Sequence, residues 1–249
     1  MGHFDSHCHL DDPRFAADLP AVAAIAVAAG VTSALVPGVE PSSLTKPLPD
    51  VPGMTLYRAG GLHPAVPHAP EALSLLEAAL SRGGLIAIGE CGLDKRHRSP
   101  GDLEIFRTQL DLAAAYDLPV VLHVVHAHEE VLAALKARPV RGVVHAYGGS
   151  WPLAKRYLDL GIALGIGGIG TWPTATRLHE TIRECPADGM VLETDAPDLS
   201  PSWIRGQRNE PAQLVGIAEA IATLRGTSAT EVLEASDAVG ARLFRIPVG

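Results

Sequence analysis

Three residues near the start of the chain, Asp5, His7 and His9, are separated by single residues. If this stretch is a strand, its two-residue period points all three side chains to one face. Two imidazoles and a carboxylate on one face suit a divalent cation, because neutral imidazole nitrogen and carboxylate oxygen are common ligands of zinc and similar ions. A His-x-His pair alone also fits an ordinary polar strand end, so the rest of the chain has to decide between the two interpretations.

More histidines and carboxylates stand at the ends of short apolar segments farther along the chain. They are Glu90 after 85–89, His123 after 119–122, His145 after 142–144 and Asp195 after 190–194, and His63 follows the segment 55–59. Each one alone is more often a hydrogen-bonded core histidine, a helix cap or half of an ion pair. Buried carboxylates without a metal would need other cations, and none of the apolar segments contains a lysine.

These segments are part of a regular alternation of strands and helices. Strands are expected in the opening ten residues and at 31–36, 55–59, 85–90, 119–123, 142–145, 162–166 and 190–195. Helices are expected at 19–29, 70–81, 102–116, 128–137, 151–159 and 174–184, from about 209–211, and after a capping box formed by Ser228 and Glu231. Prolines at 41, 47, 49 and 52 leave room for only a short helix between the second and third strands.

Eight short strands alternating with helices predict an α/β fold, a (β/α)8 TIM barrel forming a single domain over 1–249. An open doubly wound sheet fits less well, because no G-x-G-x-x-G motif follows the first strand. In such barrels the active site lies at the carboxyl ends of the strands. The histidines and carboxylates at the segment ends should therefore converge on one site.

Composition limits the classes of partner. The 249 residues carry a net charge of -8 with only 20 basic residues, which argues against a broad basic surface for nucleic acid but leaves room for local positive charge from bound ions. Three cysteines, odd in number and far apart, predict neither disulfides nor a thiolate metal site, so a reducing cytoplasm fits best. No segment is long and apolar enough for a membrane span.

The motifs of the chain resemble those of the TatD family of metal-dependent deoxyribonucleases over almost its whole length. They are D-S-H-C-H-L at 5–10, G-L-H-P at 61–64, I-G-E-C-G-L-D at 88–94, L-H at 122–123, V-V-H-A-Y-G-G-S at 143–150, L-E-T-D-A-P at 192–197 and R-G-Q-R-N-E-P at 205–211. The resemblance implies a barrel with two divalent ions, Mg²⁺, Mn²⁺ or Zn²⁺. It implies that His7, His9 and Asp195 hold one ion, that His123 and His145 hold the other, and that Glu90 bridges them.

Two departures from the family pattern concern the substrate. Members commonly carry H-S-R after the fifth strand, whereas this chain has His123, Val124, Val125 and His126 in that place, so an arginine expected near the phosphate is missing. Tyr147 is followed by two glycines where the family has an F-S-G stretch, a mild change. In the cluster 123–128 only His123 ends an apolar strand, so we expect His123, not His126 or His128, to bind metal.

The resemblance predicts hydrolysis of DNA, as single strands or at ends, or of a small phosphodiester. Asp195 is expected to be the general base beside the bridging Glu90, and His63 to bind a phosphate oxygen or protonate the leaving group. Arg205 is expected to contact phosphate, or else to pair with Glu210. The rings of Tyr147, Trp172 and Trp203 are expected either to stack on bases or to pack between loops.

Two other classes of function stay open. An amidohydrolase-like enzyme would cleave a carboxyl ester, an amide or an aminoacyl-tRNA bond, but related enzymes often bridge their metals with a carbamylated lysine where this chain has Glu90. The lysines at 46, 95, 136 and 155 all fall in expected loops or helices. A non-catalytic metal-binding module is expected to lack either His63 or the bridging carboxylate, and this chain has both.

Overall fold

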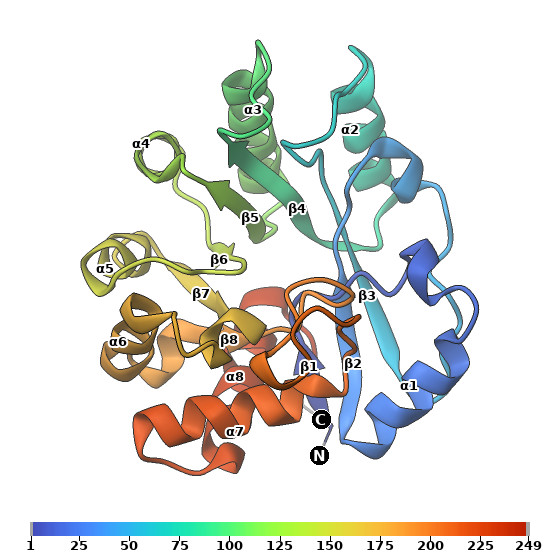
Figure 1. Cartoon of the computed structure of the whole chain (residues 1–249). Helices are drawn as coiled ribbons and strands as arrows, with labels where there is room; N and C mark the ends of the chain where they lie inside the picture. The colour runs from blue at the N-terminus through green and yellow to red at the C-terminus, as the bar shows by residue number, and fades with distance from the viewer. Residues whose placement is uncertain (1, 248–249) are drawn as a thin grey trace.

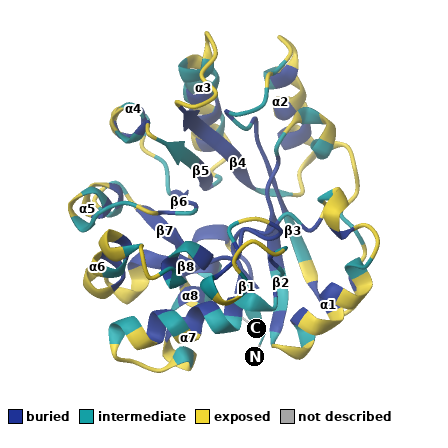
Figure 2. Cartoon of the chain, in the orientation of Figure 1, coloured by how far each residue is buried: buried dark blue, intermediate teal, exposed yellow. Residues whose placement is uncertain are grey.

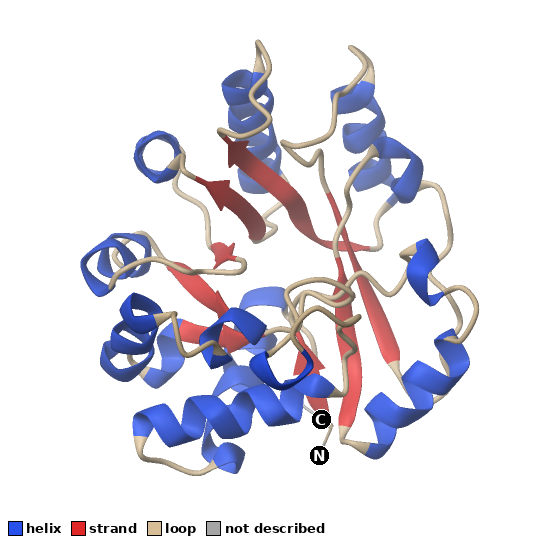
Figure 3. Cartoon of the chain, viewed as in Figure 1, coloured by secondary structure: helices blue, strands red, loops and turns tan. Residues whose placement is uncertain are grey.

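A computed structural model describes residues 2–247 and places eight strands in one sheet, with parallel neighbours in sequence order (Figure 1). The strands are β1 His3–Asp5, β2 Val31–Val36, β3 Thr55–Gly60, β4 Leu85–Asp94, β5 Val120–Val125, β6 Gly142–Val144, β7 Ile162–Ile166 and β8 Met190–Leu192. The helices are α1 Leu19–Ala28, α2 Ala72–Arg82, α3 Asp102–Ala115, α4 His128–Ala137, α5 Trp151–Leu158, α6 Thr176–Glu184, α7 Gln213–Arg225 and α8 Ala229–Phe244. The helices surround the strands (Figure 3).

Backbone hydrogen bonds join the first and last strands and complete the ring. The Ser6 amide donates to the Leu192 carbonyl at 3.1 Å, and the Asp195 amide donates to the His7 carbonyl at 2.8 Å. The predicted (β/α)8 barrel is therefore confirmed. None of its helices within residues 2–247 is both long and apolar enough to cross a membrane.

Several strands differ from their predicted bounds where they approach the site. β1, β6 and β8 end before the histidines and the aspartate that were expected to close them, so these ligands lie on the loops just beyond. Ala146 at φ 47° and Asp195 at φ 58° are in the left-handed region, which a strand cannot contain. β4 and β5 instead continue as far as Asp94 and Val125, because these two residues pair in one parallel ladder.

The apolar residues of the strands form two layers. One residue from each strand enters a cluster inside the barrel, namely Phe4, Leu35, Ala59, Ala87, Val121, Val143, Ala163 and Val191. Their sequence neighbours, such as Val36, Ile88, Leu122 and Val144, belong to the larger cluster beneath the helices. Alternate residues of a strand face opposite sides, so both faces of this sheet carry buried apolar residues. Most strand residues are buried (Figure 2).

Helix α8 closes the amino-terminal end of the barrel. Leu243 and Phe244 pack on the interior cluster, and the Phe244 ring lies edge-on to Phe4 with centroids 5.7 Å apart. Asp237 accepts a hydrogen bond from the Phe4 amide at 2.9 Å, which fixes the helix to β1. The predicted capping box at the start of α8 is confirmed. Burial of a phenylalanine side chain contributes about 1.5–3 kcal/mol, so this plug is a substantial part of the core.

Candidate metal centre

Inside the barrel, the layer of apolar side chains is followed by a layer of polar side chains toward the carboxyl ends of the strands. His123, His145 and Glu193 each stand two residues beyond an interior valine of β5, β6 or β8. The two-residue period of a strand therefore places them above the apolar layer. Gly165 leaves the space they need, since a Cβ at this position would overlap the Glu193 carboxylate. The same alternation that builds the core thus builds the floor of the site.

Glu90 reaches the interior through an irregularity in β4. Ile88 packs beneath the helices, so simple alternation would turn Glu90 to the same outer side. The register between β4 and β5 shifts between Gly89 and Cys91, and Cys91 takes the outward position instead. Such bulges re-aim side chains, often next to active sites. The carboxylate is 2% exposed and points among the histidines.

The first cluster consists of His7, His9, Glu90 and Asp195. The Nε2 atoms of His7 and His9 are 3.3 Å apart, and each lies 3.4–3.5 Å from Glu90 Oε1 and from Asp195 Oδ1. Four ligands at about 2.0–2.1 Å from a tetrahedral ion are about 3.3–3.4 Å apart, by the geometry of zinc sites. The spacing of these four atoms therefore fits a divalent cation.

Asp5 does not join this cluster, contrary to the expectation that it shares a face with His7 and His9. Strand β1 ends at Asp5 and the chain bends, so the strict alternation stops there. The Asp5 carboxylate accepts hydrogen bonds from the Thr194 amide at 2.9 Å, from the Thr194 hydroxyl at 2.5 Å and from the His7 amide at 3.2 Å. Burial raises the pKa of Asp5 to about 7. Its position ties the loop of His7 to the loop after β8.

The second cluster surrounds the other oxygen of Glu90. His145 Nε2 lies 3.2 Å and His123 Nδ1 lies 3.4 Å from Glu90 Oε2. The remaining nitrogen of each ring faces a further carboxylate: His123 Nε2 is 3.0 Å from Asp94, and His145 Nδ1 is 3.4 Å from Glu193. His123 Nε2 is hydrogen-bonded to Asp94, and a ring that donates through one nitrogen offers the lone pair of the other to a metal, the usual arrangement for histidine ligands. His145 Nδ1 faces Glu193 without a hydrogen bond. The sequence analysis did not single out Asp94 or Glu193.

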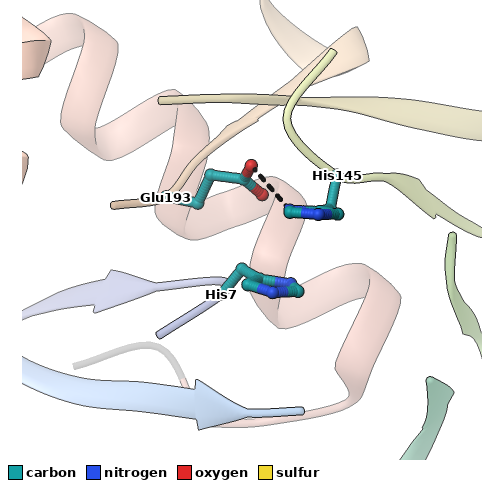
Figure 4. A group of neighbouring side chains, drawn as sticks. All are labelled: His7, His145 and Glu193. Atoms are coloured by element: carbon teal, nitrogen blue, oxygen red, sulfur yellow. Dashed lines mark ion pairs between the residues drawn. The ribbon is translucent and has the colours of Figure 1, made fainter. Parts of the chain in front are cut away.

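Figure 4 shows how His145, Glu193 and His7 lie together. The rings of His7 and His145 stack with centroids 3.9 Å apart, and the Glu193 carboxylate approaches His145 from the side away from Glu90. The Ala146 amide donates to Glu193 at 2.5 Å and holds it in place. Within these three side chains, His7 Nδ1, His145 Nδ1 and Glu193 Oε2 are buried without a hydrogen-bond partner among the described residues. Such groups are costly in an apolar surrounding, so the cluster is built for polar ligands.

His63 differs from the other histidines in its tautomer. Its Nε2 lies 3.2 Å from His123 Nδ1 and 3.5 Å from Glu90 Oε2, within the second cluster. Its Nδ1, however, accepts a hydrogen bond from the Ala65 amide at 3.0 Å. The neutral ring therefore carries its proton on Nε2, which makes that atom a donor. His63 lies close enough to Glu90 and His123 for the three to hold an ion, so its expected role as a hydrogen-bond donor to phosphate or leaving group stays a prediction.

The electrostatics of the centre keep its carboxylates ionised. Burial alone would raise the pKa of Glu90, but the charges of His7 and His145 hold it well below its usual range. Burial likewise opposes protonation of His9, yet the carboxylates of Asp195 and Glu90 raise the pKa of His9 to about 9. The nearby carboxylates likewise raise the pKa of His145, whereas burial lowers the pKa of His7. In the absence of an ion His9 and His145 thus carry protons that a dication binding here must displace.

Both clusters open into one cleft of about 610 Å³ that His9, His63, Glu90 and His123 help to line. Arg96, which the sequence analysis overlooked, also lines this cleft. Asp94 fixes its guanidinium through Nε at 3.1 Å and Nη2 at 2.7 Å. Where the family pattern has an arginine two residues after His123, this chain has Val125, which pairs with Asp94 between β4 and β5. A guanidinium therefore stands beside the position where the family pattern led us to expect one.

Tyr147, Arg205 and Trp172 were expected to bind substrate, and each contacts other parts of the protein. The structure does not offer the Tyr147 ring for stacking, because the ring is buried and its hydroxyl donates to the Ser150 carbonyl at 2.7 Å. The guanidinium of Arg205 lies over the Trp172 ring, 4.5 Å from its centroid. This contact replaces the alternative pairing of Arg205 with Glu210, which Arg208 contacts instead.

Two further expectations concern Trp203 and the histidines that follow His123. Trp203 is 47% exposed and its indole nitrogen donates to Gln213, so its ring neither lines the cleft nor is buried between loops. His126 and His128 do not contact Glu90 and line a neighbouring cavity, whereas His123 faces Glu90. The geometry therefore agrees with His123 as the metal-facing member of its cluster.

Comparisons with known proteins agree over the full length. A family model described as TatD related DNase matches residues 4–245. The metal-dependent hydrolase YjjV of Escherichia coli K12 is 36% identical over 253 residues, which cover 98% of each chain. The crystal structure of YjjV matches with a TM-score of 0.89 and 34% identity over 98% of each chain. The 3'-5' ssDNA/RNA exonuclease TatD of Pantoea vagans is 34% identical over 261 residues, which cover 98% of this chain and 99% of that protein.

Proposed function

This chain is a metal-dependent hydrolase of the TatD family, and we propose that it cleaves phosphodiester bonds of single-stranded DNA with two divalent cations. The observation that carries the proposal is the placement of Glu90, whose two oxygens face two separate groups of imidazole nitrogens. The exonuclease name of the Pantoea vagans relative supports the choice of substrate.

The ligand sets follow from the free lone pairs. His7 Nε2, His9 Nε2 and Asp195 would hold one ion with Glu90 Oε1. His123 Nδ1 and His145 Nε2 would hold the other with Glu90 Oε2. Mg²⁺, Mn²⁺ and Zn²⁺ all accept carboxylate oxygen, and histidine-rich sets favour Zn²⁺ or Mn²⁺ over Mg²⁺.

Two cations bound here would lower the pKa of a water molecule and stabilise charge on the phosphoryl and leaving oxygens. Asp195 is the proposed proton acceptor, because its carboxylate stays ionised next to His9 and borders the open cleft. His63 presents Nε2–H to the cleft and is the proposed donor to a phosphate oxygen or to the leaving group. Arg96 adds a fixed positive charge beside them.

A substrate panel tests the proposal. Single-stranded DNA, RNA, bis(4-nitrophenyl) phosphate and 4-nitrophenyl acetate are each incubated with the protein and Mg²⁺, Mn²⁺ or Zn²⁺. We expect hydrolysis of DNA and of the phosphodiester, with loss of activity in chelator. Turnover of the carboxyl ester alone would assign the chain to the amidohydrolase-like alternative, in which Glu90 serves a different reaction.

A further inference from the structure

A second cavity adjoins the metal cleft on the side of β6. It measures about 600 Å³ and shares Val124, Val125, His145 and Ala146 with the cleft as lining residues. We call it the Arg177 cavity, after the arginine in the first turn of α6 that helps to line it. Its volume is within the range of about 300–1,000 Å³ typical of small-molecule sites. The cleft and this cavity are therefore neighbours beside the ends of β5 and β6.

The lining of the Arg177 cavity is suited to anions. Its polar side chains are Arg177, His126, His128, His145 and the hydroxyls of Tyr147, Ser150, Thr174 and Thr176. His128 is hydrogen-bonded to Tyr157, and His145 faces Glu90 and Glu193, so Arg177 and His126 remain for an anion. Of the described residues that line the cavity, none is an aspartate or a glutamate. The metal cleft, in contrast, is lined by Glu90, Asp195 and Asp198. In a chain of net charge -8 this local absence of carboxylates marks the cavity as distinct.

Arg177 has no structural role that explains its position. Within the described part of the chain its guanidinium makes no hydrogen bond or ion pair, and the side chain is exposed. It lies in the first turn of α6, and this turn contains no acidic residue that could pair with it. A cation at this positive end of a helix is unfavourable, so Arg177 does not stabilise the helix that carries it.

His126, between β5 and α4, is a second exposed residue of the cavity lining. Its backbone is in the left-handed region at φ 56°, a conformation that non-glycine residues seldom adopt. The side chain is exposed and lines the same cavity as Arg177. Strained backbone of this kind clusters at ligand sites. Within residues 2–247, Arg177 and His126 are thus two lining side chains of the cavity for which no hydrogen bond or ion pair is found.

We propose that the Arg177 cavity binds the phosphate of a nucleotide next to the one being cleaved, with Arg177 as its main anchor. The inference rests on the proposed phosphodiesterase function and extends it: the substrate is a nucleic-acid strand that spans both cavities, not an isolated phosphodiester. The cleft holds the scissile phosphate, and the adjoining cavity holds the neighbouring one.

Arg177→Ala tests this role, with Arg183→Ala as the matched control. Arg183 is exposed at the other end of α6 and does not line the cavity. Binding of a fluorescent single-stranded decanucleotide is measured by anisotropy in excess chelator, which prevents turnover. Loss of one charge-assisted hydrogen bond should weaken binding about tenfold in Arg177→Ala. The slope of log affinity against log salt should become shallower by about 0.7, the value for one phosphate contact on a single strand.

Hydrolysis by the metal-loaded protein supplies the second measurement. The ratio of kcat/KM for the decanucleotide to kcat/KM for bis(4-nitrophenyl) phosphate should fall about tenfold in Arg177→Ala and stay constant in Arg183→Ala. An unchanged salt slope, or equal losses on both substrates, would overturn the subsite while leaving the phosphodiesterase function intact. Weakened strand binding without hydrolysis of either substrate by the wild type would support the subsite and reject the function.

Discussion

Replacement of Asp94 by Asn tests the claim that two separate ions are bound. Asp94 accepts from His123 Nε2 at 3.0 Å and is 3% exposed, so water cannot readily replace it. Asparagine keeps the shape but removes the charge that orients the ring. A hydrogen bond to a charged group contributes about 1.5–3 kcal/mol, which corresponds to about 10- to 150-fold in affinity. Mutations of such outer carboxylates typically weaken metal binding about 10- to 100-fold, in agreement with this range.

Only the ion next to His123 should be affected, because Asp94 does not contact His7, His9 or Asp195. Zinc-loaded protein is titrated with a competing chelator, and the metal content is measured by mass spectrometry after each step. Wild type should lose both ions at high chelator concentration, whereas Asp94→Asn should release one ion at a concentration at least tenfold lower and retain the other. Circular dichroism checks that the variant is folded.

Two results would refute this reasoning. Equal weakening of both ions would mean that Asp94 supports the fold of the whole centre and not one ligand. Unchanged affinity of both ions would mean that His123 does not bind metal through Nδ1. Asp94 also holds Arg96, so Arg96→Gln serves as the control that removes the guanidinium and leaves the bond between Asp94 and His123.

Four further predictions follow from the geometry. Glu90→Gln should fold but retain fewer than two ions per chain and lose activity by orders of magnitude, because one shared anion faces both clusters; two tightly held ions with normal turnover would contradict the bridging role. His123→Ala should lose metal while His126→Ala keeps the wild-type content, since only His123 faces Glu90; mass spectrometry of dialysed protein decides. Arg96→Gln should raise the KM for phosphodiesters about tenfold with unchanged metal content, because it removes one charge-assisted contact in the cleft; loss of metal instead would show a purely structural role. In α8, hydrogen bonds from Thr227 and Ser228 lower the pKa of Glu231 from 4.5 to about 2, so its stabilising effect is present above pH 4.5 and is lost as the pH falls toward 2. Urea midpoints of wild type and Glu231→Gln should therefore converge over that window, and a constant difference would disprove the linkage.

The convergence of His123 and His145 on one site was predictable from the sequence, although the exact strand ends were not. His123 and His145 continue the alternation of apolar strands, and an apolar strand that ends in histidine is visible without a structure. The inward turn of Glu90 was not predictable from alternation, because it depends on a register shift against the neighbouring strand. The residue types of β4 do not reveal where its pairing with β5 changes register.

The carboxylates behind the histidines were missed for a similar reason. Asp94 and Glu193 stand inside motifs that the sequence analysis quoted, yet their partners, His123 and His145, lie on other strands. Arg96 lines the cleft only because β4 continues to Asp94 and pairs with Val125. Tyr147 was expected to be accessible, but local sequence could not show that its ring packs against Tyr157.

Helix α8 prevents ligands from passing through the amino-terminal end of the barrel. Phe4, Leu243 and Phe244 fill the lower end of the interior, directly beneath the polar layer of the centre. Within the described residues this apolar plug closes the amino-terminal end, so we expect water, ions, substrate and product to enter and leave at the opposite end, where the cleft opens. A nucleic-acid strand bound across the cleft would obstruct the release of cations held beneath it. We expect metal exchange to slow while product is bound, so that the enzyme keeps its ions during turnover even where it would lose them at rest.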